Sequence, residues 1–240
     1  MWLVLSQAND LAALWAARGL AARGLQPLEI VTAEALAYNL SVEHRLTANR
    51  PSVKISLADG RVIDGATVRG TLNRIQVFPT EHLRGASATD REYAEQELYA
   101  LTLSLLYALP GAMLNRPTPQ GLSGEWRQPS EWVWLAAQAG LLTLPYEQSD
   151  EREAPTVASL SRLTTRTLLV VGDACCDSSA PPSVAASCVR LAQLNATGLL
   201  GIDFHVTAAG EWVFINATPL PDLRLGGEVL LDRLANALQS

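Results

Sequence analysis

The sequence predicts an α/β fold, and three stretches lead to that prediction. At the start of the chain, residues 2–6 form a short apolar run, residues 9–24 have helical spacing, and residues 28–33 form a second apolar run. A strand, a helix and a strand in this order are a β-α-β unit, whose strands pair in parallel. Residues 52–70 alternate apolar and polar side chains around an Asp-Gly dipeptide, which is typical of a β-hairpin. Strands and helices alternate again in the last third of the chain.

The helix expected over residues 9–24 has recognisable ends. Asn9 or Asp10 can cap its start, and Gly24 can end it. The residues expected to face the core lie on one helical stripe: Leu11, Leu14, Trp15 and Leu20. No GxGxxG motif stands between the first strand and this helix, so a dinucleotide-binding site has little support.

A long helix is expected in the middle of the chain, over residues 89–111. Thr89 and Glu92 stand at capping-box spacing at its start. After Leu98 the helix is apolar on nearly all sides, which predicts that it is buried. The other segments expected in this region are a strand at 71–78 that returns to the main sheet, a loop at 79–88, a strand at 112–119, a helix at 129–141, a strand or extended segment at 142–147, and a polar linker at 148–156.

The last third of the chain repeats simple elements. A strand and turn at 166–176 precede a helix at 182–196, and two strands at 198–206 and 211–217 form a hairpin. An amphipathic helix at 226–239 closes the sequence.

Composition and charge exclude several classes of partner. The chain has 240 residues, of which 48% are hydrophobic and 18% charged, which fits a globular protein and not a disordered one. A net charge of −6 offers no basic surface for a nucleic acid or an anionic membrane. The first residues contain neither a basic segment nor an apolar run long enough for a signal peptide or a membrane span. These features predict a cytoplasmic protein.

The three cysteines make a poor disulfide framework, because their number is odd and two of them are adjacent. A metal or redox site at Cys175, Cys176 and Asp177 is an alternative. Cysteines without CxxC spacing or a nearby histidine are usually small buried side chains, and this explanation also serves for Cys188.

Several stretches together resemble the ATP-grasp superfamily, above all the peptide-modifying ligases of the graspetide-synthetase type and related amino-acid ligases. The run "DREYAEQELYALTLSLLYALPGAMLNRPTP" (90–119) is similar to the helix and strand before the family's ATP-binding lobes, and "EWVWLAAQAGLLTLP" (131–145) to the helix and exit that follow. The runs "LLVVGD" (168–173), "GIDF" (201–204) and "GEWVFINATPLPDL" (210–223) resemble the second ATP-binding lobe.

The resemblance divides the chain into three parts. Residues 1–88 resemble the pre-ATP-grasp domain, with its β-α-β unit and hairpin, and residues 89–150 link the lobes. Residues 151–240 resemble a truncated ATP-grasp core, which implies that the small lobe that clamps ATP is missing.

The resemblance also implies a metal site. Family members phosphorylate a carboxylate with ATP, and an amine or hydroxyl then displaces the phosphate, so carboxylate and amide oxygens converge on Mg²⁺. In the family an Asp on one strand, and a Glu and an Asn two apart on the next, share one face because side chains alternate along a strand. The matching positions here are Asp203, Phe214 and Asn216, so the bridging carboxylate is replaced by an aromatic ring. A match shifted by two residues, to Asn216 and Thr218, gives no better cation site.

Two further departures weaken the expected nucleotide site. The arginine with which the family contacts phosphate matches Thr167, and Arg166 is one position away, where alternation places it on the opposite face. The stretch between Pro145 and Gly172, where the resemblance implies the ATP-clamping lobe, contains no lysine and no Gly-rich loop. Lys54 is the only lysine of the chain, and it lies in the N-terminal hairpin. The phosphate charges of a bound nucleotide would have no positive partners in such a site, so we expect the protein to bind no cofactor. The alternative is that it binds ATP and Mg²⁺.

Each candidate residue also has an ordinary structural explanation. Asp203 can make local hydrogen bonds at the edge of its strand. Asn216 begins the segment Asn-Ala-Thr-Pro, which is an ordinary turn sequence. His205 shares the face of Asp203 only if the strand is regular, and a surface or satisfied histidine is the simpler explanation. The residues considered for other sites and given structural roles instead are His44, His82, Trp126, Trp132, Trp134, Arg61, Arg69 and Arg74.

The function predicted from this resemblance is a non-catalytic ATP-grasp-like protein that binds a peptide or a full-length ATP-grasp ligase in a peptide-modification or natural-product pathway. One alternative is a minimal ATP-dependent ligase that uses Asp203 and Asn216, with Arg166 or Arg190 as the cation. Another is a homodimerisation module.

Overall fold

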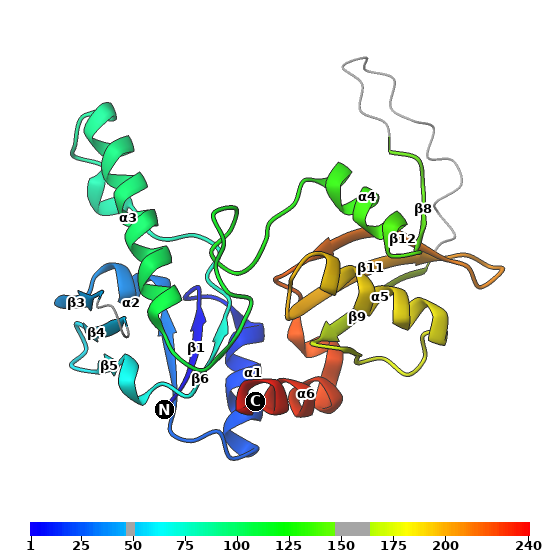
Figure 1. Cartoon of the computed structure of the whole chain (residues 1–240), viewed down its shortest axis with the longest axis horizontal. Helices are drawn as coiled ribbons and strands as arrows, with labels where there is room; N and C mark the ends of the chain where they lie inside the picture. The colour runs from blue at the N-terminus through cyan, green and yellow to red at the C-terminus, as the bar shows by residue number, and fades with distance from the viewer. Residues whose placement is uncertain (47–50, 147–163) are drawn as a thin grey trace. The chain divides into compact units, whose positions relative to one another are not determined.

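The computed structural model describes residues 1–46, 51–146 and 164–240 of the chain, which divide into two compact units. The first unit comprises Met1–Glu125 together with Gly227–Ser240, and the second comprises Trp126–Gly226 (Figure 1). The linker expected at 148–156 lies outside the described residues, and the division into three parts stays a prediction.

A four-stranded parallel sheet forms the centre of the first unit. Its strands, in the order β2-β1-β6-β7, are β2 (Leu28–Thr32), β1 (Trp2–Ser6), β6 (Gly70–Asn73) and β7 (Ala112–Leu114). Every residue of β1 is buried, as expected for a central strand of a parallel sheet covered on both faces. The predicted β-α-β unit is therefore confirmed, and the strand predicted at 71–78 does return to the main sheet, but it ends at Asn73.

The helix of the β-α-β unit, α1 (Leu11–Ala22), buries a different face from the one expected. Asp10 caps its start by accepting a hydrogen bond from the Ala13 amide at 2.9 Å, but Leu11 is 62% exposed. The buried residues are Ala12, Ala13, Ala16, Ala17 and Leu20. The reason is the helix α6 (Gly227–Gln239), because small residues on α1 let the two helices approach closely.

Two features show how close that approach is. A β-carbon added to Gly19 would collide with the side chain of Leu231 on α6. At the end of α1, Arg23 forms ion pairs of 2.7 Å with both Glu228 and Asp232.

A second, antiparallel sheet of the first unit contains β3 (Ser41–Arg45), β4 (Ser52–Ser56) and β5 (Val62–Asp64). The hairpin predicted around Asp59-Gly60 is confirmed, and Gly60 has the positive φ of 87° that the turn requires. Strand β3 was not predicted, and it follows the short helix α2 (Ala33–Ala37).

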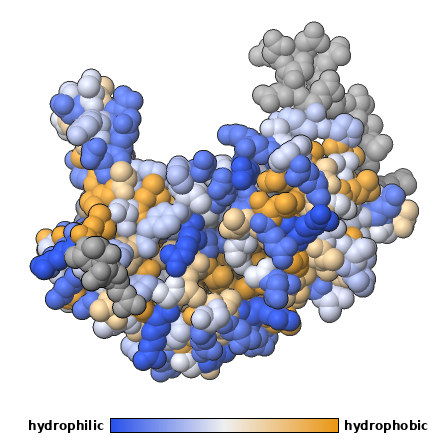
Figure 2. Space-filling model, in the orientation of Figure 1, coloured by the Kyte–Doolittle hydropathy of each residue, from blue (hydrophilic) through white to orange (hydrophobic). Residues whose placement is uncertain are grey.

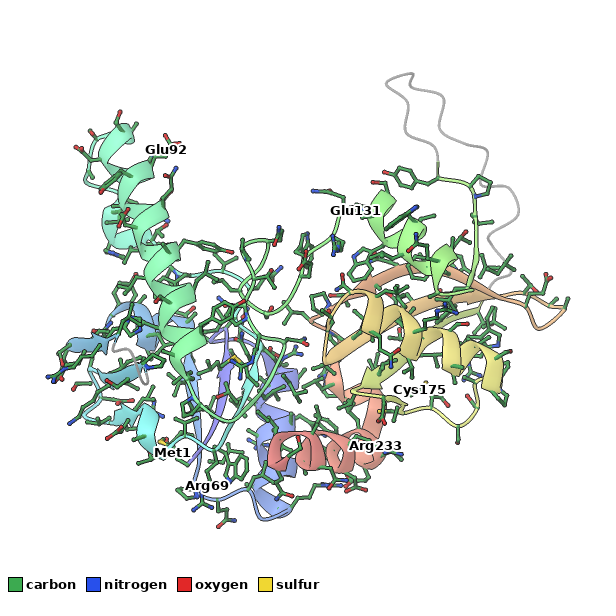
Figure 3. All side chains as sticks on the ribbon, in the orientation of Figure 1. Met1, Arg69, Glu92, Glu131, Cys175 and Arg233 are labelled. Atoms are coloured by element: carbon green, nitrogen blue, oxygen red, sulfur yellow. The ribbon has the colours of Figure 1, made fainter. Side chains whose placement is uncertain are left out.

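The long helix α3 (Ala88–Ala108) is less buried than its composition predicts. It begins at Ser87, whose hydroxyl accepts a hydrogen bond from the Asp90 amide at 3.2 Å, and not at Thr89. Only Thr102, Leu106 and Ala108 are buried, because one side of the helix covers the antiparallel sheet and the other side faces solvent. Its N-terminal turns, where Figure 3 labels Glu92, are coloured hydrophilic in Figure 2.

The core of the first unit lies between the two sheets and the C-terminal half of α3. Its larger buried side chains are Leu3, Leu5, Val31, Val53, Ile55, Leu57, Ile63, Ile75, Leu106 and Leu122.

The second unit is a five-stranded sheet with helices on one face. The strands, in the order β10-β9-β11-β12-β8, are β10 (Ala174–Cys175), β9 (Thr164–Val171), β11 (Leu199–Val206), β12 (Trp212–Thr218) and β8 (Leu142–Thr143). Helices α4 (Pro129–Gln138) and α5 (Pro182–Leu194) pack on the face that carries Leu168, Ile202 and Phe204. The hairpin predicted at the end of this unit is confirmed.

Helix α4 follows the sequence prediction closely. Pro129 is its first residue, and Glu131, labelled in Figure 3, accepts a hydrogen bond from the Gln128 amide at 2.8 Å. Trp132 is 3% exposed and Trp134 is 61% exposed, so only one of the two faces the core, as expected. None of the described helices is both long and apolar enough to cross a bilayer.

Candidate functional site

Asp203 and Asn216, the residues that the resemblance matches to a metal site, lie on the second unit's sheet, and Asp203 is on the face opposite to α4 and α5. Strand β11 is central, and its Asp203 pairs with Thr167 on β9 and with Asn216 on β12. A carboxylate, a hydroxyl and an amide therefore stand in one row across three adjacent strands. We call Thr167, Asp203 and Asn216 the polar row.

Strand β12 does not alternate regularly beside this row. Asp203 pairs with Asn216, but the next residue, Phe204, pairs with Phe214, so Ile215 is an extra residue in a β-bulge. Phe214 is 3% exposed and its ring meets that of Phe204 edge-on, with centroids 6.4 Å apart. Phe214 thus belongs to the core beneath the sheet. The expectation that Phe214 and Asn216 share one strand face is wrong, because it assumed regular alternation.

The carboxylate of the polar row already has a partner. The Thr167 hydroxyl donates a hydrogen bond of 2.6 Å to Oδ1 of Asp203, and both residues are half-buried. Arg166 pairs with Phe204 in the register, so it stands on the other face of β9 from Thr167. The guanidinium is therefore offset from the row in the way the sequence predicts.

His205 lies two residues beyond Asp203 on the same regular strand and hence on the same face. Its Nδ1 is buried without a hydrogen-bond partner. Across the part of the chain that the structure describes, no three His, Cys, Asp or Glu side chains come together as a metal-binding group. The polar row and His205 thus form a polar face with a single carboxylate.

A hollow of about 250 Å³ adjoins the polar row at Thr167. Two loops provide most of its lining, with Cys176, Asp177 and Ser178 from one and Leu225 and Gly226 from the other. Hydrogen bonds from Ser179, with a smaller attraction to Arg166, hold the pKa of Asp177 below its ordinary value. No sequence motif marks this hollow, because its two loops are far apart in the chain.

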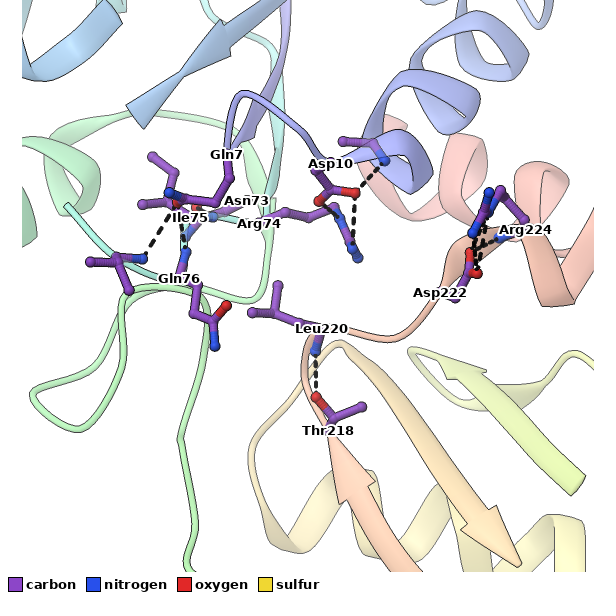
Figure 4. A network of polar contacts seen from close by, with 12 residues as sticks. Gln7, Asp10, Asn73, Arg74, Ile75, Gln76, Thr218, Leu220, Asp222 and Arg224 are labelled. Atoms are coloured by element: carbon purple, nitrogen blue, oxygen red, sulfur yellow. Dashed lines mark hydrogen bonds and ion pairs between the residues drawn. The ribbon is translucent and has the colours of Figure 1, made fainter. Parts of the chain in front are cut away.

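The segment that follows β12 is held by hydrogen bonds and an ion pair between residues close together in the chain (Figure 4). The Thr218 hydroxyl accepts a hydrogen bond from the Leu220 amide at 3.1 Å, and Arg224 pairs with Asp222 at 2.7 Å. Thr218 thus takes part in a turn, but Asn216 lies within β12 and pairs with Asp203, so the turn expected for Asn216 itself is wrong.

Two of the cysteines, Cys175 and Cys188, behave as structural residues. Cys188 is fully buried in the core of the second unit, and burial raises the pKa of its thiol far above the ordinary value. Burial likewise raises the pKa of Cys175. A raised thiol pKa disfavours the thiolate that metal binding or redox chemistry requires.

Three arginines considered from the sequence do not share a surface for an anionic peptide. Arg61 forms ion pairs with Glu29 at 3.0 Å and Asp59 at 2.7 Å. Arg74 is 5% exposed and forms a 2.7 Å ion pair with Asp10, so it is not on a solvated face (Figure 4). Arg69 is exposed at the start of β6 (Figure 3). His82 contacts the ring of Tyr38, and His44 lies on β3 and not in a loop.

The polar row does not fit the Mg²⁺ and ATP that the fold family implies. Magnesium in a phosphoryl-transfer site needs carboxylates that bridge it to the phosphates, and the row offers one carboxylate with one oxygen already hydrogen-bonded. The resemblance matches the family's phosphate-binding arginine to Thr167, which carries no charge. No step of nucleotide chemistry is therefore derived from these residues.

No protein-family model matches the sequence, and no curated protein does. Solved structures are similar over nearly the whole chain. The macrocyclase MdnC from Microcystis aeruginosa MRC, bound with the precursor peptide MdnA, has a TM-score of 0.69 at 13% identity, with 99% of each chain covered. The RiPP-associated ATP-grasp ligase of Chryseobacterium gregarium, in complex with ADP and a leader and core peptide, has a TM-score of 0.70 at 10% identity, with 98% and 96% covered.

The ATP-grasp ligase PsnB, complexed with minimal precursor, Mg and ADP, has a TM-score of 0.67 at 15% identity, with 99% of this chain and 96% of PsnB covered. At such low identity a structural likeness establishes the fold and nothing finer. The chain has an ATP-grasp-like fold.

Proposed function

We propose that this chain is a non-catalytic ATP-grasp-like protein that binds a peptide. The observation behind the proposal is the polar row, in which the Thr167 hydroxyl, and not a cation, lies 2.6 Å from the Asp203 carboxylate. A protein that transfers phosphoryl groups needs positive charge and bridging carboxylates at this place. The row supplies one carboxylate, one hydroxyl and one amide.

The expected loss of the small ATP-clamping lobe agrees with this proposal and stays a prediction. Part of the stretch between Pro145 and Gly172 lies outside the described residues. The stretch contains no lysine in the sequence, whereas the resemblance implies lysines there.

A peptide is the favoured ligand because of what the similar structures contain. MdnC was crystallised with a precursor peptide, and the Chryseobacterium gregarium ligase with a leader and a core peptide. A chain that keeps this fold without a fitting nucleotide site keeps the means to bind a peptide and not the means to activate it. A peptide-modification or natural-product pathway, in the cytoplasm, is the corresponding setting.

Calorimetry tests the non-catalytic part of the proposal. Mg²⁺ and ATP titrated into the full chain should give no binding heat up to about 1 mM nucleotide, because phosphate charges lack partners. PsnB, whose structure contains Mg and ADP, is the positive control in the same buffer. Micromolar binding of ATP to this chain would overturn the proposal.

Three other outcomes correspond to the remaining candidates. A stable complex with a complete ATP-grasp ligase, seen by light scattering, would make the ligase the partner in place of a free peptide. A mass of twice 25.8 kDa with no peptide binding would indicate a homodimerisation module. ATP-dependent turnover that Asp203→Ala abolishes would indicate a minimal ligase.

A further inference from the structure

The first unit contains a groove along one side of α3 that is separate from the polar row. Two hollows, of about 370 and 270 Å³, meet at Thr80 and Glu95, which line both. The larger hollow is polar and contains Arg84 and Arg91, and the smaller one has an apolar floor. We call the two together the α3 groove.

Internal contacts hold the walls of the α3 groove in place. Asn73 is fully buried, and its side chain donates hydrogen bonds to the carbonyls of Asn115 at 3.0 Å and Leu122 at 2.6 Å. Leu122 is part of the groove floor. The side chain of Gln7 accepts hydrogen bonds from the Gln76 and Val77 amides, which belong to the opposite wall (Figure 4).

The helix wall is tied to the same segments. The Thr80 hydroxyl donates to Glu95 at 3.1 Å, and the Tyr99 hydroxyl faces the Thr118 carbonyl at 3.5 Å. Thr118 closes its own loop through two backbone hydrogen bonds with Gly121. Three separate segments of the chain therefore hold the groove open, which is the preformed geometry that a binding site needs.

In the larger, polar hollow of the α3 groove, some charged side chains have a hydrogen-bond or ion-pair partner among the described residues and others have none. Four charged residues line it, and they are Glu81, Arg84, Arg91 and Glu95. Glu95 accepts the Thr80 hydrogen bond, whereas neither Arg84 nor Arg91 forms an ion pair within the described part of the chain. Arg91 is half-buried, whereas Glu81 is exposed. Because Glu95 already accepts a hydrogen bond and the two arginines are in no ion pair with the residues described, a carboxylate has two guanidinium groups to pair with at this end of the groove.

The apolar end offers exposed hydrocarbon next to that charge. Val77 is 61% exposed, and Leu98 and Tyr99 are half-buried beside the floor. Along α3, Arg91 and Tyr99 are eight positions apart, which is about 12 Å at the helical rise. Four residues of an extended peptide span about 13 Å and return to the same side of the strand.

We propose that the α3 groove binds an extended peptide segment that has an acidic side chain and a large apolar side chain four positions apart. The carboxylate lies against Arg84 and Arg91, and the apolar side chain lies on Leu98, Tyr99 and Val77. This site rests on the proposed peptide-binding function and names the surface and the peptide chemistry, while the absence of nucleotide binding is tested independently.

The test uses the full chain, isotopically labelled, and the capped peptide Gly-Ser-Glu-Gly-Ser-Gly-Phe-Gly-Ser. Titration should shift the backbone amide resonances of residues 77–84 and 91–99. A peptide with Gln in place of Glu, and one with Ser in place of Phe, should each bind at least about fivefold more weakly.

Two exchanges on the protein sharpen the result. Arg91→Glu should weaken binding of the acidic peptide at least about tenfold, and the Gln peptide should be affected far less. Arg18→Glu is the control, since it makes the same charge change at another helical arginine, which is exposed on α1 outside the groove. Equal thermal midpoints of both variants and the native chain exclude misfolding as the cause.

The possible outcomes distinguish peptide binding in the α3 groove from peptide binding elsewhere on the protein. Shifts centred on the groove that Arg91→Glu removes and Arg18→Glu retains would support the proposal. Shifts centred on Asp203 would overturn the groove and leave peptide binding standing. No shifts with 5 mM peptide, an amount chosen to detect Kd values of about 1 mM, would overturn the groove as well.

Discussion

Glutamate should be tolerated far better at position 215 than at position 214, although the two positions are adjacent on β12. The β-bulge points Phe214 into the core, where it is 3% exposed and packs edge-on against Phe204. Ile215 is 37% exposed. Removal of a buried phenylalanine side chain costs about 3–5 kcal/mol of unfolding free energy, and a buried carboxylate without a cation adds to that loss.

For Phe214→Glu we therefore expect a loss of at least about 4 kcal/mol at pH 7, and for Ile215→Glu a change within about 1 kcal/mol. Burial raises the pKa of the introduced carboxyl in the folded state. The penalty at position 214 is therefore smallest below about pH 4, the unfolded value, and grows as the pH rises above it.

Urea unfolding followed by tryptophan fluorescence measures both variants, because Trp132 and Trp212 lie in the second unit near this sheet. Phe214→Leu is the control, since it changes shape without charge and should cost about 1 kcal/mol. Equal losses for the two glutamate variants would refute the bulge and the placement of the polar row. If Ile215→Glu folds, its Mn²⁺ affinity should exceed that of Ile215→Gln by about tenfold, measured by calorimetry, because a second carboxylate then stands beside Asp203.

Three further outcomes are expected. Asp10→Asn should lower the unfolding free energy of the first unit by about 3 kcal/mol in urea, because it breaks the 2.7 Å ion pair between Asp10 and the nearly buried Arg74. Trp132→Ala should cost about 3–5 kcal/mol and Trp134→Ala less than about 1 kcal/mol, measured in the same way, because only Trp132 is buried. Iodoacetamide at pH 8 should label Cys188 only as fast as the chain unfolds, because burial hides the thiol and raises its pKa; labelling at the rate of a free thiol, followed by mass spectrometry, would contradict this.

The parts of the fold that the sequence predicted correctly have local signals. The alternation around Asp59-Gly60 specifies a hairpin with no help from the rest of the chain, and Pro129 with Glu131 specifies the start of α4. The parts that it did not predict depend on distant neighbours. The alanine face of α1 is buried because α6 lies on it, about two hundred residues later in the chain.

The candidate site shows the same division. The hairpin that places Asp203 and Asn216 on neighbouring strands was predicted from two apolar runs joined by a short turn, and the structure pairs the two residues directly. The bulge at Ile215 has no signal in the sequence, because neither neighbour is a glycine or a proline, and so Phe214 was placed on the wrong face. The α3 groove was also missed, since its walls come from segments that no single motif joins.

The burial of the Asp10–Arg74 ion pair has a desolvation cost, and the structure suggests what this pair contributes in return. Two charges removed from water usually stabilise a protein no better than apolar side chains of the same size. Arg74 begins the segment that forms one wall of the α3 groove, and the amides of Gln76 and Val77 in that segment are held by Gln7. We infer that the pair fixes the path of residues 74–78, a specific geometry that an apolar pair would leave undetermined.

The double exchange Asp10→Leu with Arg74→Met tests separately whether the pair fixes the path of residues 74–78 and whether it raises the free energy of unfolding. Its unfolding free energy should equal or exceed that of the native chain, because the exchange removes both charges of the Asp10–Arg74 pair together with their desolvation cost. The amide resonances of residues 76–78 should nevertheless broaden or shift, and peptide binding to the α3 groove should weaken, because that wall has lost its fixed path. A variant that is destabilised but binds the peptide normally would show that the pair supports the fold and has no part in shaping the groove.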